Sequence, residues 1–197
     1  ADRSRPYPFY LAHPLEETEA LTGTRSDWLA EWKWDGIRGQ LIQRKGEVFI
    51  WSRGEELVTG KFPELEQMGK LLPEGTVLDG EIMPFEKGSP LPFGVLQTRL
   101  GRKTVSTRLL REAPVTFMAY DLLEWKGKDV RHWELWKRRE TLKELVRSLA
   151  ADKLKLSREL SETDWTELAV LREQSRSVKA EGLMLKRKNG VYETGRK

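Results

Sequence analysis

Near the N-terminus a lysine lies between two tryptophans, in the stretch Glu31–Arg38, which reads EWKWDGIR. We expect two strands, Leu29–Lys33 and Ile37–Arg44, each of which shares residues with this stretch. Gly36 permits a close backbone approach just after the lysine. Lysine is rarely placed in an apolar segment for packing alone. A lysine that loses its proton in a partly dry site can act as a nucleophile, so Lys33 is a candidate catalytic residue.

The residues of this stretch leave two interpretations open. In one, Lys33 carries the chemistry, and Arg38 presents a planar set of donors to phosphate or ribose oxygens. In the other, the stretch is a surface strand with a Lys33–Asp35 ion pair. The choice depends on whether later segments supply the other groups that the chemistry needs.

Strands and helices are interspersed along the rest of the chain, and the early strands are joined by short turns. This order predicts an α+β fold with largely antiparallel sheets flanked by helices. The strongest helical periodicity runs from about Trp133 to Leu149. The other expected strands are Val48–Ser52, Thr76–Met83, Val115–Leu123 and Gly182–Arg187. The other expected helices are Pro63–Leu72, two short ones within residues 91–112, and one that a capping box at Ser161 and Asp164 opens and that runs to about Gln174.

Composition narrows the class of protein. With 38% hydrophobic and 34% charged residues, the chain suits a folded domain. It has no cysteine, so disulfides and thiolate metal sites are excluded. Because we find neither a signal peptide nor an apolar run of the roughly 20 residues that span a bilayer, we expect no membrane partner and a cytoplasmic location.

Basic residues gather in residues 97–111 and 175–197, where they outnumber acids. Such clusters suit a triphosphate or a nucleic-acid backbone, although a solvated basic face has the same composition. Within the first cluster, Arg99, Arg102 and Lys103 are candidate DNA contacts.

Four later segments carry further candidate groups. On a strand Asp79 and Glu81 point to the same face, so two carboxylates could converge on one metal or ribose. Glu181 and Lys186 are five positions apart, and a regular strand would turn them to opposite faces. The four segments are Ser52–Glu55, Asp79–Glu81, Ala119–Leu123 and Glu181–Lys186. Taken singly, they are weak evidence for a site, because an Asp-Gly-Glu sequence is often a turn and a tyrosine such as Tyr120 more often belongs to the core.

Together with Lys33-Trp34-Asp35-Gly36-Ile37-Arg38, these segments resemble, in order, the motifs of bacterial-type ATP-dependent DNA ligases, which are relatives of RNA ligases and mRNA-capping enzymes. The resemblance spans residues 31–186. It implies the nucleotidyltransferase (ATP-grasp-like) core of the covalent nucleotidyltransferase superfamily, with a single adenylation domain over residues 1–197. It also implies that the family's C-terminal OB-fold and any N-terminal DNA-binding domain lie outside this sequence.

The resemblance assigns roles to the candidate residues. Lys33 would attack the α-phosphate of ATP and carry AMP. Glu31 would accept a hydrogen bond from the adenine amino group, and because a carboxylate cannot donate to a guanine carbonyl, ATP is favoured over GTP. The other implied roles are phosphate contacts for Arg38, Arg53 and Lys186, stacking on adenine for Tyr120, and ribose and Mg²⁺ or Mn²⁺ contacts for Glu81 and Glu181.

The implied partner is nicked duplex DNA, to whose 5′-phosphate the AMP would pass before the 3′-hydroxyl attacks. We expect a monomer that binds ATP and, without the OB-fold, seals nicks poorly. Two alternatives stay open at this point: an RNA ligase that uses the same chemistry, and a non-catalytic DNA-binding module that grips phosphates through the basic clusters.

Overall fold

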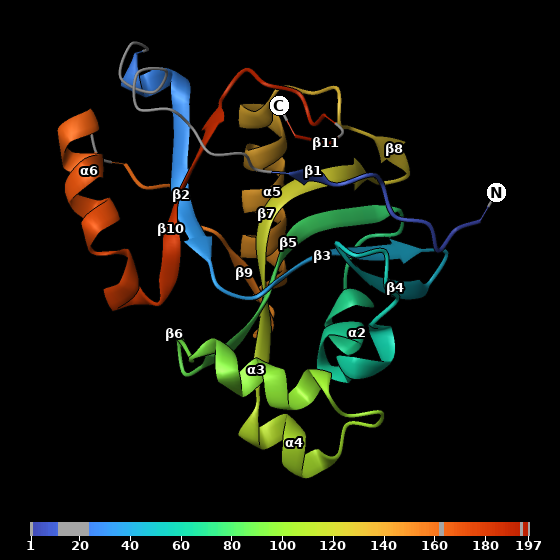
Figure 1. The fold of residues 1–197 in the computed structure, drawn as a ribbon. Helices are drawn as coiled ribbons and strands as arrows, with labels where there is room; N and C mark the ends of the chain where they lie inside the picture. Colours follow the sequence, from blue (N-terminus) through green and yellow to red (C-terminus); the bar gives the residue numbers. More distant parts are fainter. Residues whose placement is uncertain (1, 12–23, 162–163, 194, 197) are drawn as a thin grey trace.

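A large antiparallel sheet forms the centre of the computed structural model, which describes residues 2–11, 24–161, 164–193 and 195–196 (Figure 1). Its main strands are ordered β4-β3-β5-β7-β8. This arrangement confirms the predicted fold class. The strands are β3 (Ile37–Arg44), β4 (Glu47–Ser52), β5 (Thr76–Glu86), β7 (Val115–Trp125) and β8 (Lys128–Asp129), with β6 (Ser89–Pro90) on β5 and β9 (Leu154–Leu156) parallel to β7.

A separate antiparallel pair, β2 (Trp28–Trp34) and β10 (Ala180–Arg187), lies beside the large sheet (Figure 1). One face of this pair packs against α6 (Trp165–Glu173) through a small apolar cluster that includes Trp32 and Leu168. Because side chains alternate along a strand, every second residue of β2 is left to face away from α6.

Helices cover one face of the large sheet. In Figure 1, α5 lies behind β7 and β9, and α2 lies next to β3 and β4. Buried side chains such as Leu142 on α5 and Leu65 on α2 meet Leu41 and Leu122 of the sheet, and each stabilises the fold by about 1.5–3 kcal/mol. The helices are α2 (Pro63–Gly69), α3 (Phe93–Leu100), α4 (Thr107–Glu112) and α5 (Leu135–Leu149), with 3₁₀ turns at Arg25–Asp27, Thr59–Lys61 and Ser175–Val178.

Segments from both ends of the chain cover the other face. Tyr7, Tyr10 and Tyr192 pack against Ile42 and Leu123 of the sheet. The short strands β1 (Tyr10–Leu11) and β11 (Gly195–Arg196) pair in parallel there. The two ends of the described chain are therefore joined over the sheet.

Two helix boundaries differ from the prediction. The expected N-cap at Ser161 is wrong: α6 begins after Asp164, whose side chain accepts a hydrogen bond of 2.7 Å from the backbone N–H of Glu167. The helix that begins at Pro63 ends at Gly69 rather than at Leu72. Within the described ranges, no helix has the length and apolar character needed to cross a bilayer.

Candidate active site

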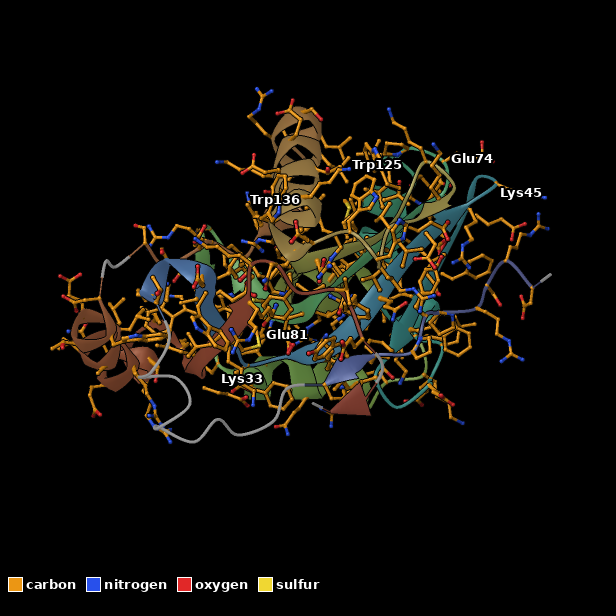
Figure 2. The ribbon with its side chains drawn as sticks, turned by 90° about the horizontal axis from the view of Figure 1, so that it is seen from above. Lys33, Lys45, Glu74, Glu81, Trp125 and Trp136 are labelled. Carbon is orange, nitrogen blue, oxygen red and sulfur yellow. The ribbon has the colours of Figure 1, made fainter. Side chains whose placement is uncertain are left out.

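The face of the β2–β10 pair that points away from α6 carries several of the predicted site residues. Cross-strand partners share a face, and Glu31 pairs with Met184 while Lys33 pairs with Gly182. Lys186, opposite Leu29, follows the same alternation. Figure 2 places Lys33 and Glu81 in the same part of the molecule, where this pair meets the large sheet.

Glu181 reaches this face because it lies in a β-bulge. Ala180 pairs with Trp34 and Gly182 with Lys33, so Glu181 is an extra residue without a partner across the strand pair. Its Oε2 lies 3.7 Å from Lys33 Nζ, and the two side chains are 50% and 51% exposed. The bulge thus overcomes the five-residue spacing that would otherwise turn Glu181 away from Lys186. The ion pair of Lys33 is with Glu181, so the predicted Lys33–Asp35 pair is wrong, although Lys33 is exposed on its strand.

Glu31 is fully buried between two cations. Its Oε1 accepts a hydrogen bond from Lys186 Nζ, and its Oε2 lies 3.5 Å from Arg139 Nη1. Arg139, on α5, also donates to the backbone carbonyls of Tyr120 at 3.0 Å and Ser157 at 2.6 Å. Sequence reasoning missed Arg139; the available signal was its position three residues before Leu142, on the buried face of the helix.

Tyr120 also lies in a bulge. Asp79 pairs with Asp121 and Gly80 with Ala119, so Tyr120 is the extra residue of β7. Its ring is buried, with Lys186 Nζ 4.8 Å from the ring centroid. Gly80 allows this close pairing, because a Cβ there would lie 2.4 Å from the carbonyl oxygen of Met118.

The predicted convergence of Asp79 and Glu81 on one ligand is wrong for Asp79. Arg38 donates to both Asp79 oxygens, from Nε and Nη2, at 2.5 Å each. Tyr192, which sequence reasoning also missed, donates its hydroxyl to Asp79 Oδ2 at 2.7 Å. Asp79 is therefore fully engaged by protein groups, and Glu81 is left as the available carboxyl of the motif.

Glu81 is buried, and its Oε2 has no hydrogen-bond partner among the described residues. Burial raises the pKa of Glu81 to about 8; the charges of Asp79 and Glu181 add to this shift, while Arg38 and Lys33 oppose it. An unpartnered carboxyl near a second carboxylate suits a divalent cation. Mg²⁺ is commonly held by one or two carboxylates together with substrate phosphates. The described residues contain no group of three or more His, Cys, Asp or Glu side chains that could hold a metal ion.

The remaining predicted residues divide into exposed and buried positions. Arg53 is exposed, and its backbone N–H donates to the carbonyl of Arg38 at 3.0 Å. Arg102 and Lys103 are exposed in the segment after α3. The prediction that Arg99 contacts DNA is wrong, because its side chain is 0% exposed and pairs with Glu64 at 2.5 Å.

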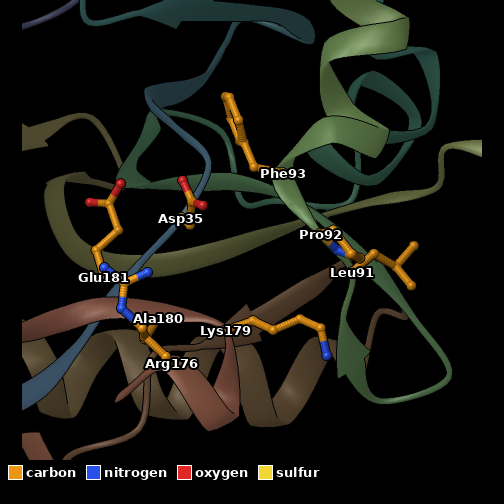
Figure 3. A pocket seen from close by; sticks show the side chains of 8 residues that line it. All are labelled: Asp35, Leu91, Pro92, Phe93, Arg176, Lys179, Ala180 and Glu181. Carbon is orange, nitrogen blue, oxygen red and sulfur yellow. The ribbon is translucent and has the colours of Figure 1, made fainter. Parts of the chain in front are cut away.

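A cavity of about 450 Å³ is lined in part by Glu181, the ion-pair partner of Lys33. Figure 3 shows Asp35 and Glu181 near one another, with the Leu91–Phe93 segment across from them. Arg176 and Lys179, from the second basic cluster, also line it. The cavity thus combines carboxylates next to the lysine with two cations and an apolar wall.

The fold and this lysine-centred site are those of a nucleotidyltransferase-like domain, the class of domain that the sequence motifs imply. A sequence model of the family described as "ATP dependent DNA ligase domain" matches residues 9–197. The chain therefore belongs to the family of ATP-dependent DNA ligase domains.

Individual relatives agree with this assignment. A probable DNA ligase of Koribacter versatilis is 40% identical over 123 residues, which are 62% of this chain and 21% of that protein. A DNA ligase of Aeropyrum pernix is 34% identical over 196 residues, which cover 95% of this chain and 32% of that protein. The ligase domain of M. tuberculosis LigD has a TM-score of 0.74 at 28% identity, over 96% of this chain and 57% of that one. The chain thus spans a third or less of these two curated relatives.

Proposed function

We propose that Lys33 attacks the α-phosphorus of ATP, that a bond from its Nζ to phosphorus replaces the bond to pyrophosphate, and that the lysine then carries AMP. The observation that carries this proposal is the meeting of Lys33 with Glu181, Glu81 and the buried Glu31 at the junction of the two sheets. The chemistry is that of the family. A solved mycobacterial DNA ligase D, 28% identical to this chain, is described as complexed with ATP.

The adenine end of the nucleotide would lie between the β2–β10 pair and β7. Glu31 Oε2 is buried without a hydrogen-bond partner in the described part of the chain, and a carboxylate oxygen accepts from the adenine amino group. Tyr120 would supply the ring that stacks on adenine. Lys186, which lies between Glu31 and the Tyr120 ring, would reach the α-phosphate.

The carboxylates would hold the ion that accompanies the phosphates. Glu81 and Glu181 are the fitting ligands for Mg²⁺ or Mn²⁺, and a bound ion would neutralise charge on the phosphates. Glu181 Oε2 lies 3.7 Å from Lys33 Nζ, so binding of the ion by Glu181 would release the amine from this pair and leave it to approach the α-phosphorus. Arg38 and Arg53 would neutralise phosphate charge.

The polynucleotide partner would be nicked duplex DNA, to whose 5′-phosphate AMP passes. The cavity beside Glu181 supports this proposal, because Arg176 and Lys179 there suit a phosphate backbone. The exposed Arg102 and Lys103 are further candidate contacts. We propose action on DNA inside the cell, in the cytoplasm. Sealing assays on matched DNA and RNA nicks would separate this from an RNA ligase.

A labelling experiment tests the lysine. The protein is incubated with ATP labelled at the α-phosphate and Mg²⁺, then denatured and separated by gel. We expect label to stay on the wild type and to be lost in Lys33→Ala, because the nucleophile is gone. Lys143→Ala, which alters an exposed lysine of α5, should keep the label.

Two results would contradict the proposal. Label retained by Lys33→Ala would show that another residue is the nucleophile. Label that also appears with ATP marked only at the γ-phosphate would indicate phosphorylation rather than transfer of AMP. A mass increase of one AMP on the purified protein, lost in Lys33→Ala, gives an independent readout.

A further inference from the structure

Behind the site, a tyrosine near the C-terminus shares a carboxylate with Arg38. The hydroxyl of Tyr192 donates to Asp79 Oδ2 at 2.7 Å, and Arg38 donates to both oxygens of Asp79. The backbone of Tyr10 completes a closed ring of hydrogen bonds: its N–H donates to the Tyr192 hydroxyl at 3.0 Å, and its carbonyl accepts from Arg38 Nη2 at 2.9 Å. The Asp79 side chain is only 1% exposed, so this ring excludes water.

These hydrogen bonds involve the Nε and Nη2 edge of the Arg38 guanidinium and leave the edge with Nη1 available to a ligand. Nε and Nη2 are bonded, whereas Nη1 has no hydrogen-bond partner among the residues that the structure describes. The guanidinium carbon lies 6.0 Å from the centroid of the Tyr120 ring, next to the residues proposed to bind nucleotide. A guanidinium held along one edge can present its remaining donors to an oxygen with little loss of side-chain freedom.

Tyr192 is itself firmly placed. Its backbone N–H donates to the carbonyl of Arg131 at 2.9 Å, and its ring meets that of Tyr10 edge to face at 5.6 Å. Just before it, Gly190 accepts a hydrogen bond of 2.8 Å from the backbone N–H of Leu135 at the start of α5. The hydroxyl of Tyr192 is thus delivered to Asp79 by a segment anchored on α5 and on the N-terminal strand.

We infer that Tyr192 is a positioning residue for the proposed transfer of AMP: through Asp79 it fixes the orientation in which Arg38 meets the nucleotide. This inference rests on the proposed function and adds a residue to it. Tyr192 does not touch the reacting atoms; it acts through Arg38.

The same sheet face contains a second arrangement of the same kind, which serves as a control. Tyr7 donates its hydroxyl to Glu124 Oε1 at 2.6 Å, and Arg44 donates to the two oxygens of Glu124 at 3.2 and 3.1 Å. Tyr7 and Tyr192 pack in one apolar cluster. Arg44 lies at the other end of β3 from Arg38, about 20 Å along the strand. It is therefore distant from Lys33.

The test compares Tyr192→Phe with Tyr7→Phe. Each removes one hydroxyl that donates to a carboxylate, so the melting temperatures should fall by similar amounts. Only Tyr192→Phe should slow formation of the labelled lysine at saturating ATP, by about tenfold, with little change in the ATP concentration that gives half the maximal rate. Equal labelling rates for the two variants would overturn the inference. It would also be overturned if Tyr192→Phe changed only the ATP concentration that gives half the maximal rate and left the rate at saturating ATP unchanged.

A second comparison checks that the effect passes through Arg38. In an Arg38→Lys background, which cannot make the paired contact with Asp79, Tyr192→Phe should slow labelling by less than about twofold. A full tenfold loss in that background would show that Tyr192 acts by another route and would overturn the inference. A wild-type protein that forms no label would contradict the proposed function itself, whereas normal label in Tyr192→Phe would contradict only the role of Tyr192.

Discussion

At the scale of single residues, Glu81 has the most perturbed surroundings of the proposed ligands. It is buried, near two other carboxylates, and one of its oxygens has no hydrogen-bond partner in the described ranges. Burial raises its pKa from an ordinary 4.5 to about 8, so near neutral pH it is largely protonated without a cation. A ligand that binds the carboxylate must therefore displace a proton, and binding should strengthen as the pH rises.

This shift has a consequence for stability. Between pH 4.5 and pH 8 the folded protein binds a proton on Glu81 that the unfolded chain has released. The contribution of Glu81 to stability is fully present below the lower value and is lost as the pH rises through the upper one. Glu81→Gln carries no such charge. We expect its melting temperature, relative to the wild type, to be higher at pH 8.5 than at pH 5, by about 5 °C.

Melting curves at the two pH values, in buffer without divalent ions, measure this difference. The control is Glu86→Gln, which changes an exposed carboxylate at the end of the same strand. A difference between Glu81→Gln and the wild type that is the same at both pH values would contradict the assignment.

At the scale of the elements, the site depends on two places where a strand departs from regular pairing. Bulges present Tyr120 from β7 and Glu181 from β10. The bulge in β7 lies opposite Gly80, where the two backbones come so close that no side chain fits. The glycine of the Asp-Gly-Glu motif is therefore required by the packing of β5 on β7.

We expect Gly80→Ala to destabilise the protein by about 1–3 kcal/mol, because its Cβ would force these central strands apart. Gly94→Ala, on α3, is the matched control, since a Cβ there meets no atom within 4 Å. It should be neutral or stabilising by up to about 1 kcal/mol. Denaturant unfolding of both variants measures the effect, and equal stabilities would refute this account of Gly80.

Local sequence predicted the elements better than it predicted their contacts. The strand that contains Lys33, the strand that follows it and the helix ending at Leu149 follow from composition and periodicity, which depend on near neighbours. The partner of Asp79 could not be predicted in this way, because Tyr192 reaches it from 113 residues away. Bulges are likewise invisible to an alternation rule. The sequence assigned Glu181 to the site only through the family resemblance. The bulge in β10 explains how its carboxylate comes to lie beside Lys33.

At the scale of the whole molecule, the first basic cluster divides between the interior and the surface. Arg99 turns inward, where Glu64, the carbonyls of Lys61 and Ala113, and the ring of Phe62 surround its guanidinium. Since these partners come from other segments, the sequence around Arg99 could not distinguish it from its exposed neighbours. Arg102 and Lys103 are exposed, as are Arg108 and Arg111 on α4.

We expect the double variant Arg102→Ala and Lys103→Ala to bind nicked duplex DNA more weakly, because the phosphate contacts proposed for these two residues would be removed. The slope of log affinity against log salt concentration should decrease in magnitude by about 2. Binding titrations at several salt concentrations measure this, with Lys143→Ala as the control for loss of charge elsewhere. An unchanged slope would exclude these two residues from the DNA interface.

The bulge at Glu181 interrupts the regular pairing of β2 with β10 at the position that supplies a carboxylate to the proposed site. One residue too many is what brings an acid to the lysine; a chain without it could form an uninterrupted ladder between β2 and β10, with its apolar contacts to α6 retained. Such a protein would keep its fold and lose a carboxylate from the site. In this region, regular strand pairing and the proposed site therefore make opposite demands on the length of β10, because the residue that interrupts the pairing is the one that supplies the carboxylate.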